Sequence, residues 1–158
     1  MITQKKICIV LANFYPEISL QLLKGSETEL VKQKIKKINT NTEYLLEEKA
    51  NCYKIINVPG VFEIPVVIAQ EIKNTDGFIA LGCVIKGQTP HFEFISKSVT
   101  DAIMNLSTQY KKPIGNGIIT CLNKKQAIKR SHPKKKNKGG EAARAVLAVL
   151  GILKNESK

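Results

Sequence analysis

A glycine-containing loop that joins a buried strand to a helix, in residues 81–96, is the feature that most constrains the fold. The segment reads LGCVIKGQTPHFEFIS and continues an apolar run that starts at residue 78 and is long enough for a buried strand. After Gly87 we expect a helix in which Thr89 is the N-cap residue and Pro90 takes the first helical position. Apolar side chains then recur at helical spacing, which predicts that this helix ends at about Tyr110.

The start of this helix has chemical consequences. Its free backbone amides and the positive end of the helix dipole form an anion site, most naturally for a phosphate group. His91 lies in the first turn, where the dipole favours a neutral ring that accepts a proton near pH 7. These features together suggest proton-transfer chemistry on a phosphorylated substrate. The spacing alone leaves open the alternative that His91 only caps the helix or packs at its start.

The chain as a whole alternates strands with helices, which predicts an α/β fold. Buried strands are expected at residues 7–12, 53–58, 77–84 and 114–122, and helices at residues 16–37, 62–73, 90–110, 124–131 and 139–153. Such an alternation with short joints indicates a central parallel four-stranded sheet covered on both faces, a three-layer sandwich, in a single domain of residues 1–158. Ligands of such sheets collect at the carboxyl ends of the strands. These ends are the loops at residues 13–15, 59–63 and 84–91 and the turn around Leu122.

Composition argues against several classes of protein. No apolar stretch approaches the roughly 20 residues of a membrane span, and the N-terminus shows no signal peptide, so we expect a cytoplasmic protein without membrane contact. The four cysteines are far apart and form no CxxC pair, and only two histidines are present. This pattern does not favour a metal site. Reduced cysteines in the core are expected instead.

A basic segment follows the last predicted strand and carries much of the net charge of +12. Residues 124–143 are rich in lysine, and no acidic residue occurs between Asp101 and Glu141. Three interpretations remain open: a solvated surface, a nucleic-acid-binding patch, or a site for a small anion. The absence of interleaved aromatic residues and of helix-turn-helix or zinc motifs weakens the nucleic-acid interpretation. Arg130 differs from its lysine neighbours because its planar fork suits phosphate.

Four segments together resemble one family, the 6,7-dimethyl-8-ribityllumazine synthases of riboflavin biosynthesis. The segments are VPGVFEIP, LGCVIKGQTPHFE, PIGNGIIT and the stretch from residue 126 that ends in NKGGEAA. They occur in the family's order and at its spacing and cover nearly the whole chain. The resemblance implies a flavodoxin-like fold and a transferase. Such enzymes condense 5-amino-6-(D-ribitylamino)uracil with 3,4-dihydroxy-2-butanone 4-phosphate and release phosphate and water, without a cofactor.

The resemblance also implies roles for matching residues on the phosphate side of the site. His91 would be the catalytic residue and would shuttle protons. The phosphate of the butanone substrate would lie on three residues before the helix, namely Gly87, Gln88 and Thr89. Arg130 would reach the same phosphate from the basic segment.

A second group of residues would hold the pyrimidine substrate. Phe14 would stack on the pyrimidine ring, and Lys138 would contact it. Backbone groups at the end of the third predicted strand would bind the ring as well, at Cys83, Val84 and Ile85. Much of the rate enhancement would come from holding the two substrates together in one site.

The ribityl side of the pocket and its aromatic part complete the implied site. Val61, Phe62 and Glu63 would line the ribityl side, although Glu63 also fits a local role at a helix start. Asn116 would line the aromatic part, at a position where many members have phenylalanine. Asn57 stands where many members have tryptophan, so ring stacking is expected to be weaker here.

Further departures from the family pattern affect affinity more than reaction type. Asn13 and Tyr15 flank Phe14 where an arginine and an asparagine are common, and Lys86 replaces a common arginine. A lysine keeps the charge but loses the planar fork.

The resemblance also implies an oligomeric assembly. Family members form homopentamers with sites shared between neighbours, and some pack twelve pentamers into an icosahedral 60-subunit shell. The sequence does not decide between a pentamer and a shell.

An alternative function of another class is that of a flavin-binding or cage-forming homologue that has lost catalysis. A dinucleotide-binding enzyme is poorly supported, because no GxGxxG follows the first strand.

Overall fold

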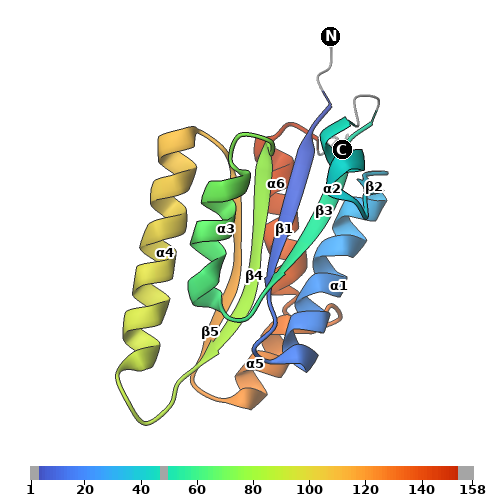
Figure 1. The fold of residues 1–158 in the computed structure, drawn as a ribbon. Helices are drawn as coiled ribbons and strands as arrows, with labels where there is room; N and C mark the ends of the chain where they lie inside the picture. The colour runs from blue at the N-terminus through green and yellow to red at the C-terminus, as the bar shows by residue number, and fades with distance from the viewer. Residues whose placement is uncertain (1–3, 47–49, 153–158) are drawn as a thin grey trace.

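A central parallel sheet organises the molecule. The computed structural model describes residues 4–46 and 50–152. The sheet has five strands in the order β2-β3-β1-β4-β5, and every neighbouring pair is parallel (Figure 1). The strands are β1 (Lys6–Ala12), β2 (Lys36–Lys37), β3 (Cys52–Val58), β4 (Gly77–Ile85) and β5 (Ile114–Cys121).

The predicted α/β class is confirmed, and the predicted count of four strands is one short. The extra strand, β2, consists of two exposed lysines that pair with Cys52 and Tyr53 at the start of β3. Its side chains show no apolar pattern, so the sequence gives no signal for it. The four predicted strands agree with the observed ones to within a residue at each end.

The helices agree less closely with the prediction. They are α1 (Pro16–Lys32), α2 (Asn41–Leu46), α3 (Ile64–Glu71), α4 (His91–Tyr110), α5 (Lys124–Ser131) and α6 (Lys138–Val149), with a 3₁₀ turn η1 (Val61–Glu63) before α3. The helix expected at residues 62–73 is therefore split into η1 and α3. The short helix α2 was not predicted. The last helix, α6, ends at Val149 rather than at the predicted residue 153, because residues 150–152 are already non-helical.

The first helix ends five residues before its predicted end. The cause is a left-handed turn at Lys34, whose φ is 58°. The backbone N–H of Ile35 donates to the carbonyl oxygen of Leu30 at 3.1 Å, and the Ile35 side chain returns to the core with 4% of its surface exposed. A left-handed residue followed by an apolar contact is a common helix end. In most sequences a glycine marks such a helix end, but in this chain the left-handed residue is Lys34.

Helices cover both faces of the sheet. Side chains of β1 and β4 alternate between two core clusters, as expected for a sheet buried on both faces. The first cluster joins the sheet to α1, α5 and α6, and the second joins it to η1, α3 and α4. The predicted three-layer arrangement is therefore observed.

The arrangement of the strands fixes where a ligand can bind. The chain runs from β1 to the edge strand β2, returns to β3 and then crosses to β4 on the other side of β1, so the connections diverge between β1 and β4. In sheets of this kind, ligands bind at such a switch point beyond the carboxyl ends of the strands. The loops after β1 and β3 are joined there, because the Asn13 N–H donates to the carbonyl oxygen of Val58 at 2.9 Å.

Candidate active site

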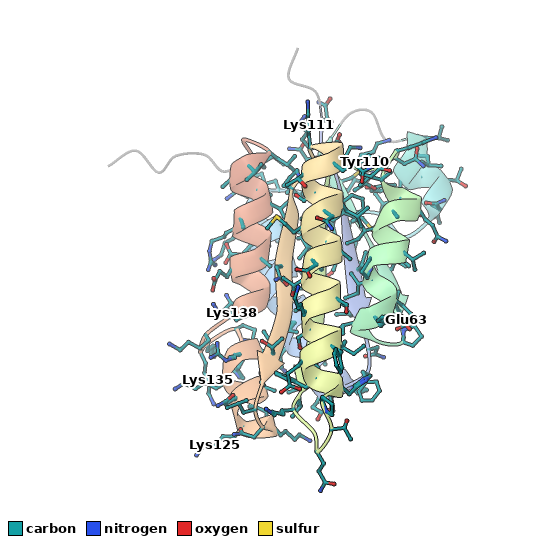
Figure 2. The ribbon with its side chains drawn as sticks, turned by 90° about the vertical axis from the view of Figure 1, so that its left-hand side faces the viewer. Glu63, Tyr110, Lys111, Lys125, Lys135 and Lys138 are labelled. Carbon is teal, nitrogen blue, oxygen red and sulfur yellow. The ribbon has the colours of Figure 1, made fainter. Side chains whose placement is uncertain are left out.

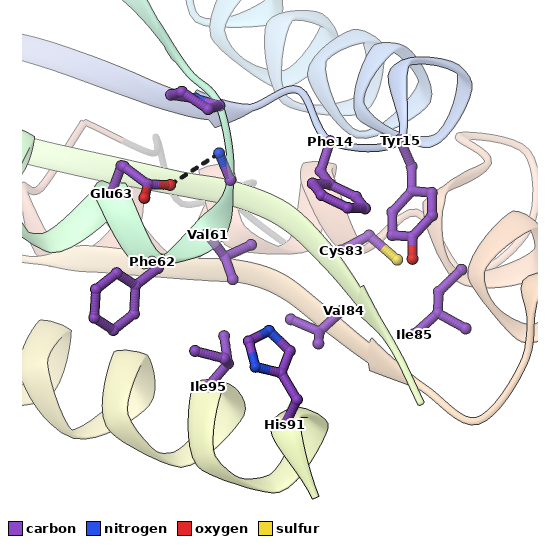
Figure 3. Close-up of a pocket in the computed structure, with 12 residues that line it drawn as sticks. Phe14, Tyr15, Val61, Phe62, Glu63, Cys83, Val84, Ile85, His91 and Ile95 are labelled. Atoms are coloured by element: carbon purple, nitrogen blue, oxygen red, sulfur yellow. Dashed lines mark hydrogen bonds between the residues drawn. The ribbon is translucent and has the colours of Figure 1, made fainter. Parts of the chain in front are cut away.

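A pocket of about 580 Å³ lies at this switch point (Figure 3). It is enclosed by the loop after β1, the segment from Pro59 through η1, the end of β4 and the first turns of α4. Its lining residues are Phe14, Tyr15, Pro59, Gly60, Val61, Phe62, Glu63, Cys83, Val84, Ile85, His91 and Ile95. The volume and mainly apolar lining are those of a small-molecule site.

Two aromatic residues from the loop after β1 form one wall. Phe14 is 68% exposed, and its ring meets the ring of Tyr15 edge-on, with centroids 5.0 Å apart and planes at 70°. Phe62 from η1 is also largely exposed, at 63%. Large aromatic surfaces that face an open pocket are well suited to cover a flat ligand.

The turn η1 is held in place by a carboxylate and by close packing. The Gly60 N–H donates to Oε2 of Glu63 at 3.0 Å (Figure 3). The Val61 side chain is buried and lies over Gly82 of β4, where a Cβ atom would approach Val61 Cγ1 to 2.5 Å. The local role of Glu63 that the sequence suggested is therefore present, and the same side chain also lines the pocket.

The end of β4 offers backbone groups to the pocket. Pairing of β4 with β1 stops at Leu81, whereas its pairing with β5 continues to Ile85. One edge of the backbone at residues 83–85 thus extends past its strand neighbour toward the loop of Phe14. Burial raises the pKa of the Cys83 thiol to about 12, with a smaller contribution from the neighbouring Cys121. A thiol with so high a pKa stays protonated at neutral pH and is a poor nucleophile.

His91 is the first residue of α4, and its ring points into the pocket beside Val84 and Ile95 (Figure 3). The side chain is exposed and has no hydrogen-bond or ion-pair partner within the described part of the chain. Both ring nitrogens are thus available to a ligand. Each can take part in proton transfer, as the proposed chemistry requires.

Two predictions for the start of this helix are wrong: Thr89 is not its N-cap residue, and Pro90 is not its first helical residue. Pro90 is the N-cap residue, no side chain caps the helix end, and the Pro90 carbonyl oxygen accepts from the Phe94 N–H at 3.2 Å. The chain is still turning at Thr89, so helical geometry starts two residues later. Proline suits this position because it has no N–H of its own to satisfy.

An ion pair ties the loop before α4 to its first turn. Lys86 Nζ lies 2.8 Å from Glu93 Oε1. The hydrogen bond from Lys86, together with a backbone hydrogen bond, lowers the pKa of the Glu93 carboxyl group below its ordinary value. The predicted phosphate residues Gly87, Gln88 and Thr89 are exposed and connect β4 to His91. They adjoin the pocket without lining it.

Three other predicted site residues lie away from the pocket of their own chain. Asn116 lies on the edge strand β5, opposite Ala80 of β4. This position is three residues, or about 10 Å, before the level of Cys83 along the strand direction. The Asn116 Oδ1 accepts a hydrogen bond from the Ile118 N–H. Arg130 is exposed on α5, and Lys138 starts α6, where it pairs with Glu141 at 2.7 Å. Both helices cover the sheet face opposite η1 and α4.

Sequence reasoning missed several residues that line the pocket. Pro59, Gly60 and Tyr15 belong to loops that were expected at the ligand end of the sheet, but no role was assigned to them. Ile95 follows His91 by four residues, and this helical spacing was a signal that both share a face. The turn around Leu122, also expected at this end, does not line the pocket.

Other features of the described residues bear on the chemistry. Among residues 4–46 and 50–152, no group of three or more His, Cys, Asp or Glu side chains is arranged to hold a metal ion. The four cysteines are buried, and none of them forms a disulfide bond within the described residues. Within the same residues, no helix is both long and apolar enough to cross a membrane.

Comparisons with known proteins show which family the chain is similar to. A family profile described as 6,7-dimethyl-8-ribityllumazine synthase matches residues 4–154. A protein from Rhodopseudomonas palustris named 6,7-dimethyl-8-ribityllumazine synthase 1 is 39% identical over 160 residues, which are 97% of this chain and 88% of the relative. A 6,7-dimethyl-8-ribityllumazine synthase from Bartonella tribocorum is 40% identical over 151 residues, covering 94% and 89% of the two chains. The chain belongs to this family.

The lumazine synthase family match confirms the resemblance drawn from four short segments. It also confirms that the chain is an enzyme. A third relative, from Agrobacterium fabrum, carries the same name and is 37% identical over 155 residues, covering 94% of both chains. The match therefore includes the pocket and all the elements around it.

Proposed function

We propose that this chain catalyses the condensation of 5-amino-6-(D-ribitylamino)uracil with 3,4-dihydroxy-2-butanone 4-phosphate to form 6,7-dimethyl-8-ribityllumazine, with release of phosphate and water. The observation that carries the proposal is the His91 ring, which points into an apolar pocket built from segments typical of the lumazine synthase family. The reaction forms an imine, eliminates phosphate and closes a ring. Each step moves a proton, and a histidine without a protein partner is suited to that task.

The pocket suits the two substrates at different places. The pyrimidine ring would lie against Phe14, with its polar edge on the free backbone edge of residues 83–85. The ribityl chain would extend along η1 toward Glu63. The phosphate of the second substrate would lie on the loop at residues 87–89, next to His91. In this arrangement the pyrimidine amine is the nucleophile, so no side chain of the protein needs to attack.

A homopentamer with shared sites would account for the residues that lie away from the pocket. Arg130 and Lys138 are on helices that cover the other face of the sheet, and Asn116 is on its open edge. A neighbouring subunit that presents its edge strand and its α5 end to this pocket would bring all three to the substrates. Arg130 would then bind the phosphate with its planar fork. The assembly of pentamers into an icosahedral shell is a separate question.

The test of the reaction is an activity assay. The purified protein is mixed with both substrates, and the lumazine product is followed by its absorbance and fluorescence. Because the condensation proceeds slowly without enzyme, a protein-free control is run in parallel. We expect His91→Ala to lower kcat by about 100-fold or more while leaving pyrimidine affinity within about twofold. Lost pyrimidine binding with unchanged kcat would contradict the proton-shuttle role.

The shared site has its own test. We expect Arg130→Ala to raise KM for the butanone phosphate by at least about tenfold, with little change in KM for the pyrimidine. Lys129→Ala, which removes an exposed cation one position earlier on α5 but no planar fork, is the matched control and should raise KM for the butanone phosphate by less than about twofold. Equal increases in both KM values would remove Arg130 from the phosphate site.

A further inference from the structure

Tyr15 lines the pocket but has no role in the reaction described above. Its position is fixed by the backbone and by packing. The Tyr15 carbonyl oxygen accepts from the N–H groups of Ile18 and Ser19, at 3.0 and 2.9 Å, at the start of α1. Its ring packs partly buried against the core cluster of α1 and meets Phe14 edge-on at 5.0 Å. Tyr15 is therefore a rigid part of the pocket wall.

The hydroxyl group of Tyr15 points toward the end of β4. Figure 3 shows it directed at the side chains of Cys83 and Ile85. Within residues 4–46 and 50–152 this hydroxyl has no hydrogen-bond partner. A tyrosine hydroxyl beside an apolar surface normally finds one. Cys83 is a weak partner, because its thiol stays protonated and thiols hydrogen-bond poorly.

The region that the hydroxyl faces is the one where the polar edge of a bound heterocycle would lie. The backbone edge at residues 83–85 has no β1 neighbour and adjoins the Phe14 ring. A flat ligand that stacks on Phe14 and reaches this edge brings its own polar atoms near the Tyr15 hydroxyl. The phosphate site, in contrast, lies at the loop before His91. The ligand group next to Tyr15 thus belongs to the uncharged ring and not to the phosphate.

We propose that Tyr15 is a specificity-determining residue for the pyrimidine substrate, whose hydroxyl group donates a hydrogen bond to a carbonyl oxygen of the uracil ring. This inference rests on the proposed function. The Tyr15 ring also holds Phe14 edge-on, so that the Phe14 face remains open for stacking. This pair supplies aromatic surface in a chain that has asparagine at positions 57 and 116.

The test separates the hydroxyl from the ring. Tyr15→Phe removes only the hydroxyl, and Tyr15→Leu removes the edge-on partner of Phe14 as well. Tyr110→Phe, at the far end of α4, is the matched control (Figure 2). Direct binding is measured with the 5-nitro analogue of the pyrimidine substrate, which lacks the reacting amine, and KM and kcat are measured for both substrates. Thermal unfolding verifies that each variant folds.

We expect Tyr15→Phe to weaken binding of the nitro analogue and to raise KM for the pyrimidine, each by about 3- to 10-fold. Tyr15→Leu should weaken both by a further factor of about 3. KM for the butanone phosphate and kcat should change less than twofold, and Tyr110→Phe should match the wild type.

The outcomes separate this inference from the proposed function. Unchanged affinity of Tyr15→Phe for the nitro analogue would overturn the inference and leave the proposed reaction intact. Equal increases in both KM values would overturn it too, because they would mark a general structural role. An inactive wild type that binds the analogue would refute the reaction, and the binding series would still decide on Tyr15. A wild type that neither reacts nor binds would refute both.

Discussion

Gly82→Ala tests how the sheet supports the pocket. Gly82 lies in β4 directly before Cys83, and a Cβ atom there would lie 2.5 Å from Val61 Cγ1 and 3.0 Å from Ala12 Cβ. Carbon atoms in contact prefer separations of about 3.5–4.0 Å. Val61 would therefore have to move by about 1 Å, while Ala12 is fixed in β1. Overpacking of this kind costs about 1–3 kcal/mol. At about 2–4 °C per kcal/mol, we expect the Tm to fall by roughly 2–12 °C.

The same substitution should affect function through η1. Displacement of Val61 shifts the turn that carries Phe62 and Glu63, so KM for the pyrimidine is expected to rise severalfold. The assay pairs thermal unfolding with steady-state kinetics at one fixed protein concentration. Gly87→Ala is the stability control, because no atom lies within 4 Å of its added Cβ. Its Tm should equal that of the wild type.

A double substitution isolates the contact. Val61→Ala removes the methyl groups that collide with the new Cβ, so the cost of Gly82→Ala should be smaller in the Val61→Ala background than alone. Neighbouring residues that share a contact show such non-additivity, of about 0.5–3 kcal/mol. Additive effects, or a Tm of Gly82→Ala equal to that of the wild type, would refute the reasoning.

Three further outcomes are expected. The buried thiols should resist 5,5′-dithiobis(2-nitrobenzoate) at pH 8 in the folded protein and react fully in guanidinium. The raised pKa of Cys83, about 12, keeps its thiol protonated at this pH. Fast labelling of the folded protein would contradict this expectation. Glu63→Ala should lower stability by about 1 kcal/mol through loss of the Gly60 hydrogen bond, whereas Glu63→Gln, which keeps an acceptor, should retain most of it. Lys54→Ala should lower the free energy of unfolding in urea by about 3 kcal/mol, because this lysine is 8% exposed and pairs with Glu71 at 2.7 Å. Neither KM should change, since the pair lies at the other end of the sheet, and a loss of pyrimidine affinity would argue against a purely structural role.

Strands β1 and β4 were predictable because each is an almost continuous apolar run, as in other buried parallel strands, and β3 and β5 are apolar-rich segments of strand length. The missed elements depend on contacts that no local pattern records. Strand β2 consists of two lysines and exists through backbone pairing with β3. The end of α1 depends on a left-handed lysine, Lys34, where glycine is the usual marker. Thr89 has the chemistry of a cap, but the loop geometry assigns that position to Pro90.

The candidate site was predictable where its residues follow strand ends and lie near each other in one chain. His91, Phe14 and the residues of η1 meet in one pocket because the parallel strands end at the same edge of the sheet. The position of Arg130 relative to this pocket could not be predicted from the sequence pattern. Its helix, α5, packs on the other face of the sheet, and no local periodicity records that distance. Tyr15 was missed for a related reason. Its position beside β4 brings together residues about 70 positions apart and rests on the pairing of β1 with β4.

The basic side chains before α4 and in residues 124–138 fit the proposed division between two chains. In the described residues, Lys86, Lys124 and Lys138 each pair with a carboxylate. Arg130 and the lysines at positions 125, 129 and 134–136 have no such pair there, and Figure 2 shows Lys125 and Lys135 at the end of the molecule where α4 begins. Paired cations hold the local structure, whereas unpaired ones remain free to attract an anion. A neighbour that brings Arg130 to the pocket would bring these lysines with it, and their summed potential favours the approach of a phosphorylated substrate over that of the uncharged pyrimidine.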